Sequence, residues 1–184
     1  ERIFETESHY SDNKQNFYEP IMRIHSIPKA IQAFANSQGG FLYIGVKDDA
    51  PAEEKIVGLD EDREIAIRSN GELSEGKFQD VLRGDIEDTL EKFLRCTNSV
   101  VSLLDFDFPQ IDGKIILEIT IKRSPAPIFF KYLSRKQKEI IFSIEIGGKK
   151  KDRKLDEFWY RAGSRKRQIE TLEDFYAFLQ GHFE

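Results

Sequence analysis

Apolar residues recur at helical spacing in three parts of the chain. The first predicted helix begins at Ser26, a candidate N-cap, and stops before Gly39-Gly40. The second covers residues 78–96, and the third begins at Thr171 with Asp174 as its capping partner. Their apolar faces are Ile27, Ala30, Ile31 and Phe34; Phe78, Val81, Leu82, Ile86, Leu90, Phe93 and Leu94; and Leu172, Phe175, Tyr176 and Leu179.

Apolar runs bounded by turn residues predict strands around these helices. The predicted strands are 41–46, 56–59, 100–108, 114–123, 128–132, 138–146 and 157–161. Asp112-Gly113 is a strong hairpin signal between two of them, and Pro125 and Pro127 place the strand that follows at an edge or a crossover. We therefore expect a single α+β domain over residues 1–184, with a mixed or antiparallel sheet packed with about three helices.

Composition fits one folded domain. The chain has 184 residues, of which 39% are hydrophobic and 33% charged. It therefore has enough hydrophobic residues to form a core. The single cysteine, Cys96, excludes an internal disulfide framework, and no stretch has the apolar length of a membrane helix. We expect a cytoplasmic protein with no membrane partner.

Positive charge is concentrated in one segment. Residues 131–168 contain 13 Lys and Arg but 5 Asp and Glu, a net charge of +8, whereas the whole chain carries −5. Such a run is either a solvated hairpin and loop or a surface that faces phosphates. The run Lys149-Lys150-Lys151 favours the solvated loop.

Four segments contain the residues most suited to chemistry. They are Glu7-Ser8 followed by Asp12 and Lys14; Ala33-Phe34-Ala35-Asn36 followed by Gly39-Gly40; Ile44-Gly45-Val46 followed by Asp48-Asp49; and Tyr160-Arg161-Ala162-Gly163-Ser164. With Ile56-Val57-Gly58-Leu59, they resemble the Schlafen/AlbA-type domain from Glu7 to about Phe178. The middle segments are the most specific part of this resemblance.

The resemblance implies a ribonuclease site. Schlafen-type ribonucleases hold a divalent metal with three carboxylates and cleave structured RNA such as tRNA. The matching catalytic and metal-binding positions are Glu7, Asp12 and Asp48, with Mg²⁺ or Mn²⁺ as the implied cofactor. This sequence has Asp12 where the family has glutamate, and Asn13 where it has phenylalanine. Other family members are binding modules or regulators.

The residues themselves are compatible with this chemistry. Clustered carboxylate oxygens are the ligands that Mg²⁺ and Mn²⁺ prefer, and a metal can stabilise charge on a reacting phosphodiester. Glu7 and Asp12 are five residues apart, so a turn near Ser8 to Ser11 is needed for them to converge. Asp48 follows a predicted strand, where it is either an exposed functional group or, with Asp49, a turn-capping pair.

Candidate phosphate contacts lie at both ends of the chain: Lys14, Arg161, Arg165, Lys166 and Arg167. Arg161, beside Trp159 and Tyr160, either grips or stacks on RNA or points outward from alternating core aromatics. Gly39-Gly40 favours a helix C-cap over a phosphate loop. Zinc-ligand spacing is missing between Cys96 and the histidines His9, His25 and His182.

Three functions stay open from the sequence. The first is a metal-dependent endoribonuclease acting on tRNA-like RNA, and the second is a non-catalytic RNA- or DNA-binding module of a regulator. The third is a nucleotide-binding or protein-interaction domain, which net acidity and the glycine pair permit. Because animal Schlafen cores join two related lobes around a groove, the resemblance also implies a homodimer that rebuilds such a groove.

Overall fold

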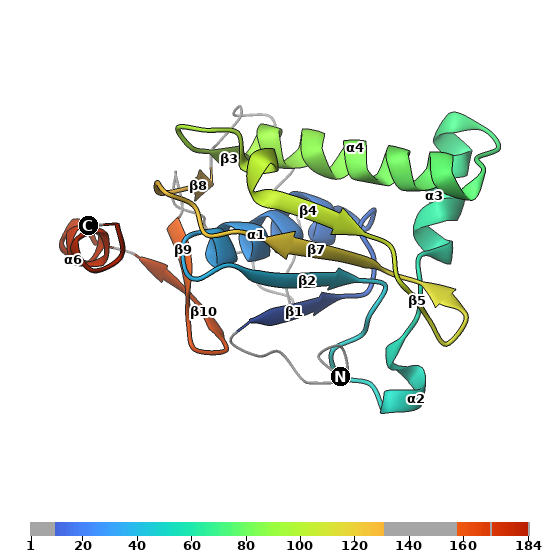
Figure 1. Ribbon diagram of the computed structural model, residues 1–184, viewed down its shortest axis with the longest axis horizontal. Helices are drawn as coiled ribbons and strands as arrows, with labels where there is room; N and C mark the ends of the chain where they lie inside the picture. Colours follow the sequence, from blue (N-terminus) through green and yellow to red (C-terminus); the bar gives the residue numbers. More distant parts are fainter. Residues whose placement is uncertain (1–9, 131–157, 170, 184) are drawn as a thin grey trace.

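A four-stranded mixed sheet forms the centre of the protein (Figure 1). The computed structural model describes residues 10–130, 158–169 and 171–183. The strands, in spatial order, are β1 (Ser11–Lys14), β2 (Gly40–Ile44), β7 (Leu117–Ile121) and β4 (Leu104–Asp107). β1 runs parallel to β2, and the other two neighbouring pairs are antiparallel. The predicted α+β class with a mixed sheet is confirmed.

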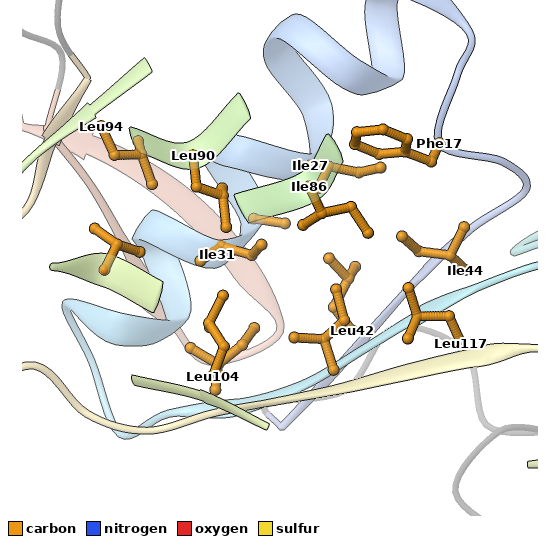
Figure 2. Packing of buried hydrophobic residues seen from close by; sticks show 14 of the residues in the cluster. Phe17, Ile27, Ile31, Leu42, Ile44, Ile86, Leu90, Leu94, Leu104 and Leu117 are labelled. Atoms are coloured by element: carbon orange, nitrogen blue, oxygen red, sulfur yellow. The ribbon is translucent and has the colours of Figure 1, made fainter. Parts of the chain in front are cut away.

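One face of this sheet packs against two predicted helices. α1 (Ile27–Ala35) and α4 (Glu75–Phe93) correspond to the first two predicted helices, although α4 ends at Phe93 and not at residue 96, because the chain becomes extended at Leu94. Along β7, Leu117, Ile119 and Ile121 are buried, and the two residues between them are half-buried on the other face. Figure 2 shows side chains of both helices meeting those of the sheet in a single apolar core.

The start of α1 differs from the prediction. A π-helical turn, η2 (Met22–Ser26), runs directly into α1, and the Ser26 side chain makes no capping hydrogen bond. Ser26 has helical backbone angles, φ −67° and ψ −42°, so it lies inside a continuous helical segment rather than at its boundary.

The region after β2 contains helices that the sequence pattern did not predict. These are the short α2 (Ala52–Lys55) and α3 (Asp60–Asn70). Residues 56–59 do not form the predicted strand, because only Ile56 makes an isolated antiparallel bridge, to Val46. The carbonyl of Gly45 accepts from both Val57 and Gly58, and Gly58 has φ +80°, so the chain turns there.

The predicted hairpin at Asp112-Gly113 is confirmed. It joins β5 (Gln110–Ile111) to β6 (Lys114–Ile115), with φ +51° at Asp112 and φ +76° at Gly113. Before β4, residues predicted as strand form instead a 3₁₀ turn, η3 (Val100–Leu103). Among the described residues, β8 (Phe129–Phe130) pairs with the two-residue β3 (Leu94–Arg95) and not with the main sheet. The predicted strand at 138–146 lies outside the described residues.

The last elements form a separate hairpin and helix. β9 (Phe158–Ala162) and β10 (Arg165–Ile169) make a two-stranded antiparallel sheet that packs on α1. α6 (Leu172–His182) begins as predicted, since the Thr171 hydroxyl accepts from the Asp174 amide at 3.1 Å. Phe175 and Phe178 of α6 make edge contacts with Phe158 of β9. Within the described ranges, no helix has both the length and the apolar character needed to cross a membrane.

Candidate functional site

The edge strand β1 carries polar residues into the protein interior. All four of its residues, Ser11 to Lys14, are buried, and Asp12 has no exposed surface. Asp12 lies opposite Leu42 and Lys14 opposite Ile44 in the parallel ladder, so both side chains share the face that carries the main core. A buried carboxylate at this position needs charged or hydrogen-bonding partners.

Cationic groups from three strands surround the Asp12 carboxylate. Its Oδ1 accepts a hydrogen bond from Lys14 Nζ at 2.5 Å. Its Oδ2 contacts Lys166 Nζ of β10 and lies 3.9 Å from Arg161 Nη1 of β9. The carboxylate therefore connects the sheet edge to the β9–β10 hairpin through ion pairs.

Asp12 also relieves an unfavourable pair within that hairpin. Arg161 and Lys166 are directly opposite each other in the antiparallel register, and like charges at such positions repel. The Arg161 guanidinium is buried, with its carbon 4.3 Å from the centre of the Phe34 ring and Nη2 donating to Ser164 O at 2.9 Å. The interpretation in which Arg161 points outward is thus wrong, whereas its role as a nucleic-acid contact stays a prediction.

The end of α1 fixes the hairpin through side-chain hydrogen bonds. Asn36 Nδ2 donates to the carbonyls of Ile128 (2.9 Å) and Trp159 (3.0 Å), and Asn36 Oδ1 accepts from the Ile128 amide (2.8 Å). Ser37 Oγ accepts from the Arg161 amide at 2.8 Å. Asn36 and Ser37 therefore have a structural role, because they tie the end of α1 to β9, the strand that carries Arg161.

Two glycines shape the turn that presents Asp48. Gly45 has φ +93°, and a Cβ there would lie 3.0 Å from the Gly58 backbone, so the two segments meet backbone to backbone. The amides of Gly45 and Val46 both donate to the Lys14 carbonyl, at 2.9 and 3.0 Å. These contacts hold the loop after β2 against the end of β1.

A pocket of about 450 Å³ opens at the carboxyl ends of β1 and β2. Its walls come from the end of β1, from η2 and α1, from the loop after β2, and from β10. The lining residues are Asn13, Lys14, Gln15, Met22, His25, Ser26, Lys29, Val46, Lys47, Asp48, Asp49 and Lys166. Among the described lining residues, the charged side chains are four lysines and two aspartates, a surplus of positive charge suited to an anionic ligand.

Asp48 is the half-buried acid of this pocket. Burial raises the pKa of its carboxyl group, whereas the charge of Lys14 acts to lower it. The charge of Asp12 acts in the same direction as burial, and a hydrogen bond from the Asn13 side chain opposes it. Asp12 and Asp48 therefore lie close enough to interact, as required for a shared site, while Asp49 is exposed.

The described residues fit the implied divalent metal only in part. Both Asp12 oxygens are engaged by lysines, so a metal ligated there would have to displace ammonium groups. Asp48 Oδ1 has no hydrogen-bond partner among the described residues and suits an incoming positive group. Across the described ranges, no three His, Cys, Asp or Glu side chains form a cluster able to hold a metal ion, and Glu7 lies outside those ranges.

The predicted basic residues divide between the interior and the surface. Arg165 and Arg167 are exposed on one face of β10, whereas Lys166 points to the other face, toward Asp12. On α1, Lys29 lines the pocket and places its Nζ 3.7 Å from the centre of the Trp159 ring. Lys149-Lys150-Lys151 and His9 lie outside the described residues.

Two contributions to this site were not predicted. One is the pocket wall formed by Met22, His25 and Lys29, which no motif indicated. The other is the strand β10 itself: its basic residues were predicted as phosphate contacts, but its charged sequence does not alternate with apolar residues. Gly163-Ser164 was the available signal, since this pair forms the two-residue loop between β9 and β10, with φ +69° at Gly163.

Comparison with known proteins identifies relatives by fold and by family. The chain is similar to the crystal structure of the DIP2311 protein from Corynebacterium diphtheriae, with a TM-score of 0.52 and 14% identity; the match covers 96% of this chain but 28% of that one. It is also similar to the solution NMR structure of the N-terminal domain of a RecG-related protein from Nitrosomonas europaea, with a TM-score of 0.39, 16% identity, and coverage of 66% and 67% of the two chains. No curated protein matches significantly. The family model described as Schlafen, AlbA_2 matches residues 7–170, and the chain therefore belongs to this family.

Proposed function

We propose that this protein binds RNA, with phosphates at the pocket wall and along the exposed face of β10. The observation that carries the proposal is the meeting of Lys14 and Lys166 at one pocket, although these two lysines are 152 positions apart in the sequence. Arg165 and Arg167 extend the positive surface on the exposed face of β10. Membership of the Schlafen, AlbA_2 family supports a nucleic-acid-related function. Structured RNA such as tRNA is the proposed partner, with DNA as a competitor to be tested.

The exposed arginines offer the direct test of this surface. Each phosphate neutralised by Lys or Arg releases counterions, so binding weakens as salt rises. Replacing Arg165 and Arg167 together by glutamine should weaken tRNA binding and reduce the slope of log affinity against log salt by about 1.5. Fluorescence anisotropy with labelled tRNA in a chelator measures both quantities.

A matched control changes the same charge elsewhere. Arg68 and Arg83 are exposed on α3 and α4, where each pairs with a glutamate one helical turn away. The Arg68→Gln/Arg83→Gln variant should keep the wild-type affinity and salt slope. Equal losses in the two double variants would show that binding follows net charge alone and would reject the proposed surface.

A second candidate function is metal-dependent cleavage of the bound RNA. It is favoured by the position of Asp48, whose carboxylate lies in the same pocket as the two lysines and interacts with Asp12. The proposed Mg²⁺ or Mn²⁺ ligands are Glu7, Asp12 and Asp48; of the two described ones, Asp48 has the oxygen better placed for a metal. A bound metal would stabilise negative charge on the phosphodiester.

Cleavage and binding are separable by one substitution. Asp48→Asn keeps the size of the side chain but removes the charge that a metal needs. We expect it to abolish any Mn²⁺- or Mg²⁺-dependent cleavage of total tRNA while leaving binding in chelator intact. Binding without a metal-dependent product from the wild-type protein would instead identify a non-catalytic RNA-binding module.

A further inference from the structure

We propose that Asp12 is a positioning residue, which holds the ammonium groups of Lys14 and Lys166 at the pocket wall so that they receive a phosphate. This inference rests on the proposed RNA binding and assigns Asp12 a role different from that of a metal ligand. Asp12 itself does not line the pocket, whereas both lysines do. The carboxylate therefore acts on a ligand through the lysines.

The contacts of Asp12 define this role. Its carboxylate has no exposed surface, and each oxygen is engaged by a different lysine. Lys14 Nζ also donates to the Asn13 carbonyl at 2.6 Å, so the side chain is held in one direction. Lysine side chains ordered before a ligand arrives lose less conformational entropy on binding, and binding is tighter as a result.

Among the described residues, cations outnumber anions at this site. Asp12 supplies one negative charge, and Lys14, Arg161 and Lys166 supply three positive ones. Arg161 is buried within the hairpin and does not line the pocket, whereas Lys14 and Lys166 do. Asp48 offsets part of the excess positive charge, yet Lys29 and Lys47 add to it at the same pocket. A phosphate group has the charge and the acceptor oxygens that two ammonium groups recognise.

The opposite role for Asp12 is less compatible with these surroundings. A divalent cation at its oxygens would lie beside two ammonium groups and a guanidinium, all of which repel it. The two roles also predict opposite effects of metal. A positioning residue affects RNA binding in the absence of metal, whereas a residue that serves only as a metal ligand affects it only in the presence of metal.

The test measures tRNA affinity of Asp12→Asn in chelator. Loss of a negative charge from a cationic surface would by itself strengthen binding to a polyanion. We expect the reverse, an affinity at least about tenfold weaker than wild type, because the lysines lose their shared partner. The matched control is Asp105→Asn: Asp105 is on β4, the opposite edge strand, and pairs with Lys122 at 2.8 Å, but it is exposed. This variant should stay within twofold (about 0.4 kcal/mol) of wild type.

Each outcome decides a different question. Equal or tighter binding by Asp12→Asn in chelator, or a loss seen only with Mn²⁺, overturns the positioning role. If Asp12→Asn does not fold, Asp12→Glu replaces it, because this variant keeps the charge while lengthening the side chain. A several-fold weaker affinity in chelator then supports positioning, and an unchanged affinity overturns it. Failure of wild-type protein to bind tRNA rejects the proposed function itself, independently of Asp12.

Discussion

Asp12 shows how one buried charge can determine the local structure. Placing a carboxylate in the interior is costly unless cations and hydrogen bonds compensate for the lost water. Here the compensation comes from Lys14 on the same strand and from Arg161 and Lys166 on the hairpin. The same ion pairs that stabilise the fold therefore order the basic side chains proposed to bind phosphate.

Removal of this carboxylate should be strongly destabilising. Asp12→Ala leaves Lys14 and Arg161 buried without their shared anion, and we expect a loss of about 3–5 kcal/mol in the free energy of unfolding. Asp105→Ala breaks an exposed ion pair and should cost about 1 kcal/mol or less. Urea denaturation of the two variants measures the difference. Similar losses for both would contradict the account of the buried cluster.

Asp62 offers a prediction about pH. Its carboxylate accepts from the amides of Phe17 and Tyr18, at 2.9–3.1 Å, and burial raises its pKa from 3.8 to about 6. The folded state thus holds a proton more tightly than the unfolded state, so this stabilisation is complete below about pH 4 and is lost as pH rises to about 6. The contribution amounts to about 3 kcal/mol at most.

Asp62→Asn removes this titration. The free energy of unfolding of the variant, measured in urea from pH 4 to pH 7, should fall less with rising pH than that of wild type. Asp60→Asn, an exposed change in the first turn of the same helix, is the control and should follow the wild-type curve. If Asp62→Asn also follows it, the raised pKa is not present in the folded protein.

At the scale of elements, β1, β2 and the loop after β2 form the framework of the pocket. The parallel pairing of β1 and β2 brings Lys14 and the loop that carries Asp48 to the same end of the sheet. Contact between the backbones of Gly45 and Gly58 then closes that loop. The spacing of these two glycines reflects a packing requirement rather than a chemical role.

Two glycine-to-alanine changes test this packing requirement, and we expect them to change the stability of the protein in opposite directions. Gly45→Ala combines a positive φ with a close backbone contact, and we expect a destabilisation of about 1–3 kcal/mol. Gly84 lies in α4 with open space around it, so Gly84→Ala should stabilise the protein by about 0.5–1 kcal/mol. Thermal denaturation distinguishes the two. A stabilised Gly45→Ala variant would show that the glycine contact does not constrain the loop.

The local pattern predicts elements with an apolar face and misses those held by distant polar contacts. α1, α4 and α6 were predictable because their apolar residues repeat at helical spacing, and β2 because it is an apolar run that follows a glycine pair. β1 reads as a polar loop, and its pairing with β2 and the ion pairs of Asp12 with β9 and β10 form only in the folded protein. α3 is mostly charged, with Asp62 and Ala66 as its buried residues. The convergence of Asp12 with Lys166 depends on folding at long range, so spacing could not show it.

At the scale of the whole molecule, the oligomeric state can be tested directly. Family resemblance implies two lobes around a groove, and a homodimer of this chain would supply both. We expect the mass from light scattering to approach that of a dimer, twice 21.4 kDa, at high protein concentration. A monomer mass at every concentration would reject the homodimer. RNA would then be bound by one copy of the chain.

The central claim is that the basic surface formed by the pocket wall and the exposed face of β10 binds the phosphates of RNA. Its most direct test is a titration of labelled tRNA with wild-type protein in chelator, repeated from low to physiological salt. We predict saturable binding whose affinity falls steeply with salt, by about 0.7–0.9 in log affinity per log salt for each phosphate contact. Failure to bind at low salt, or an affinity independent of salt, would contradict it.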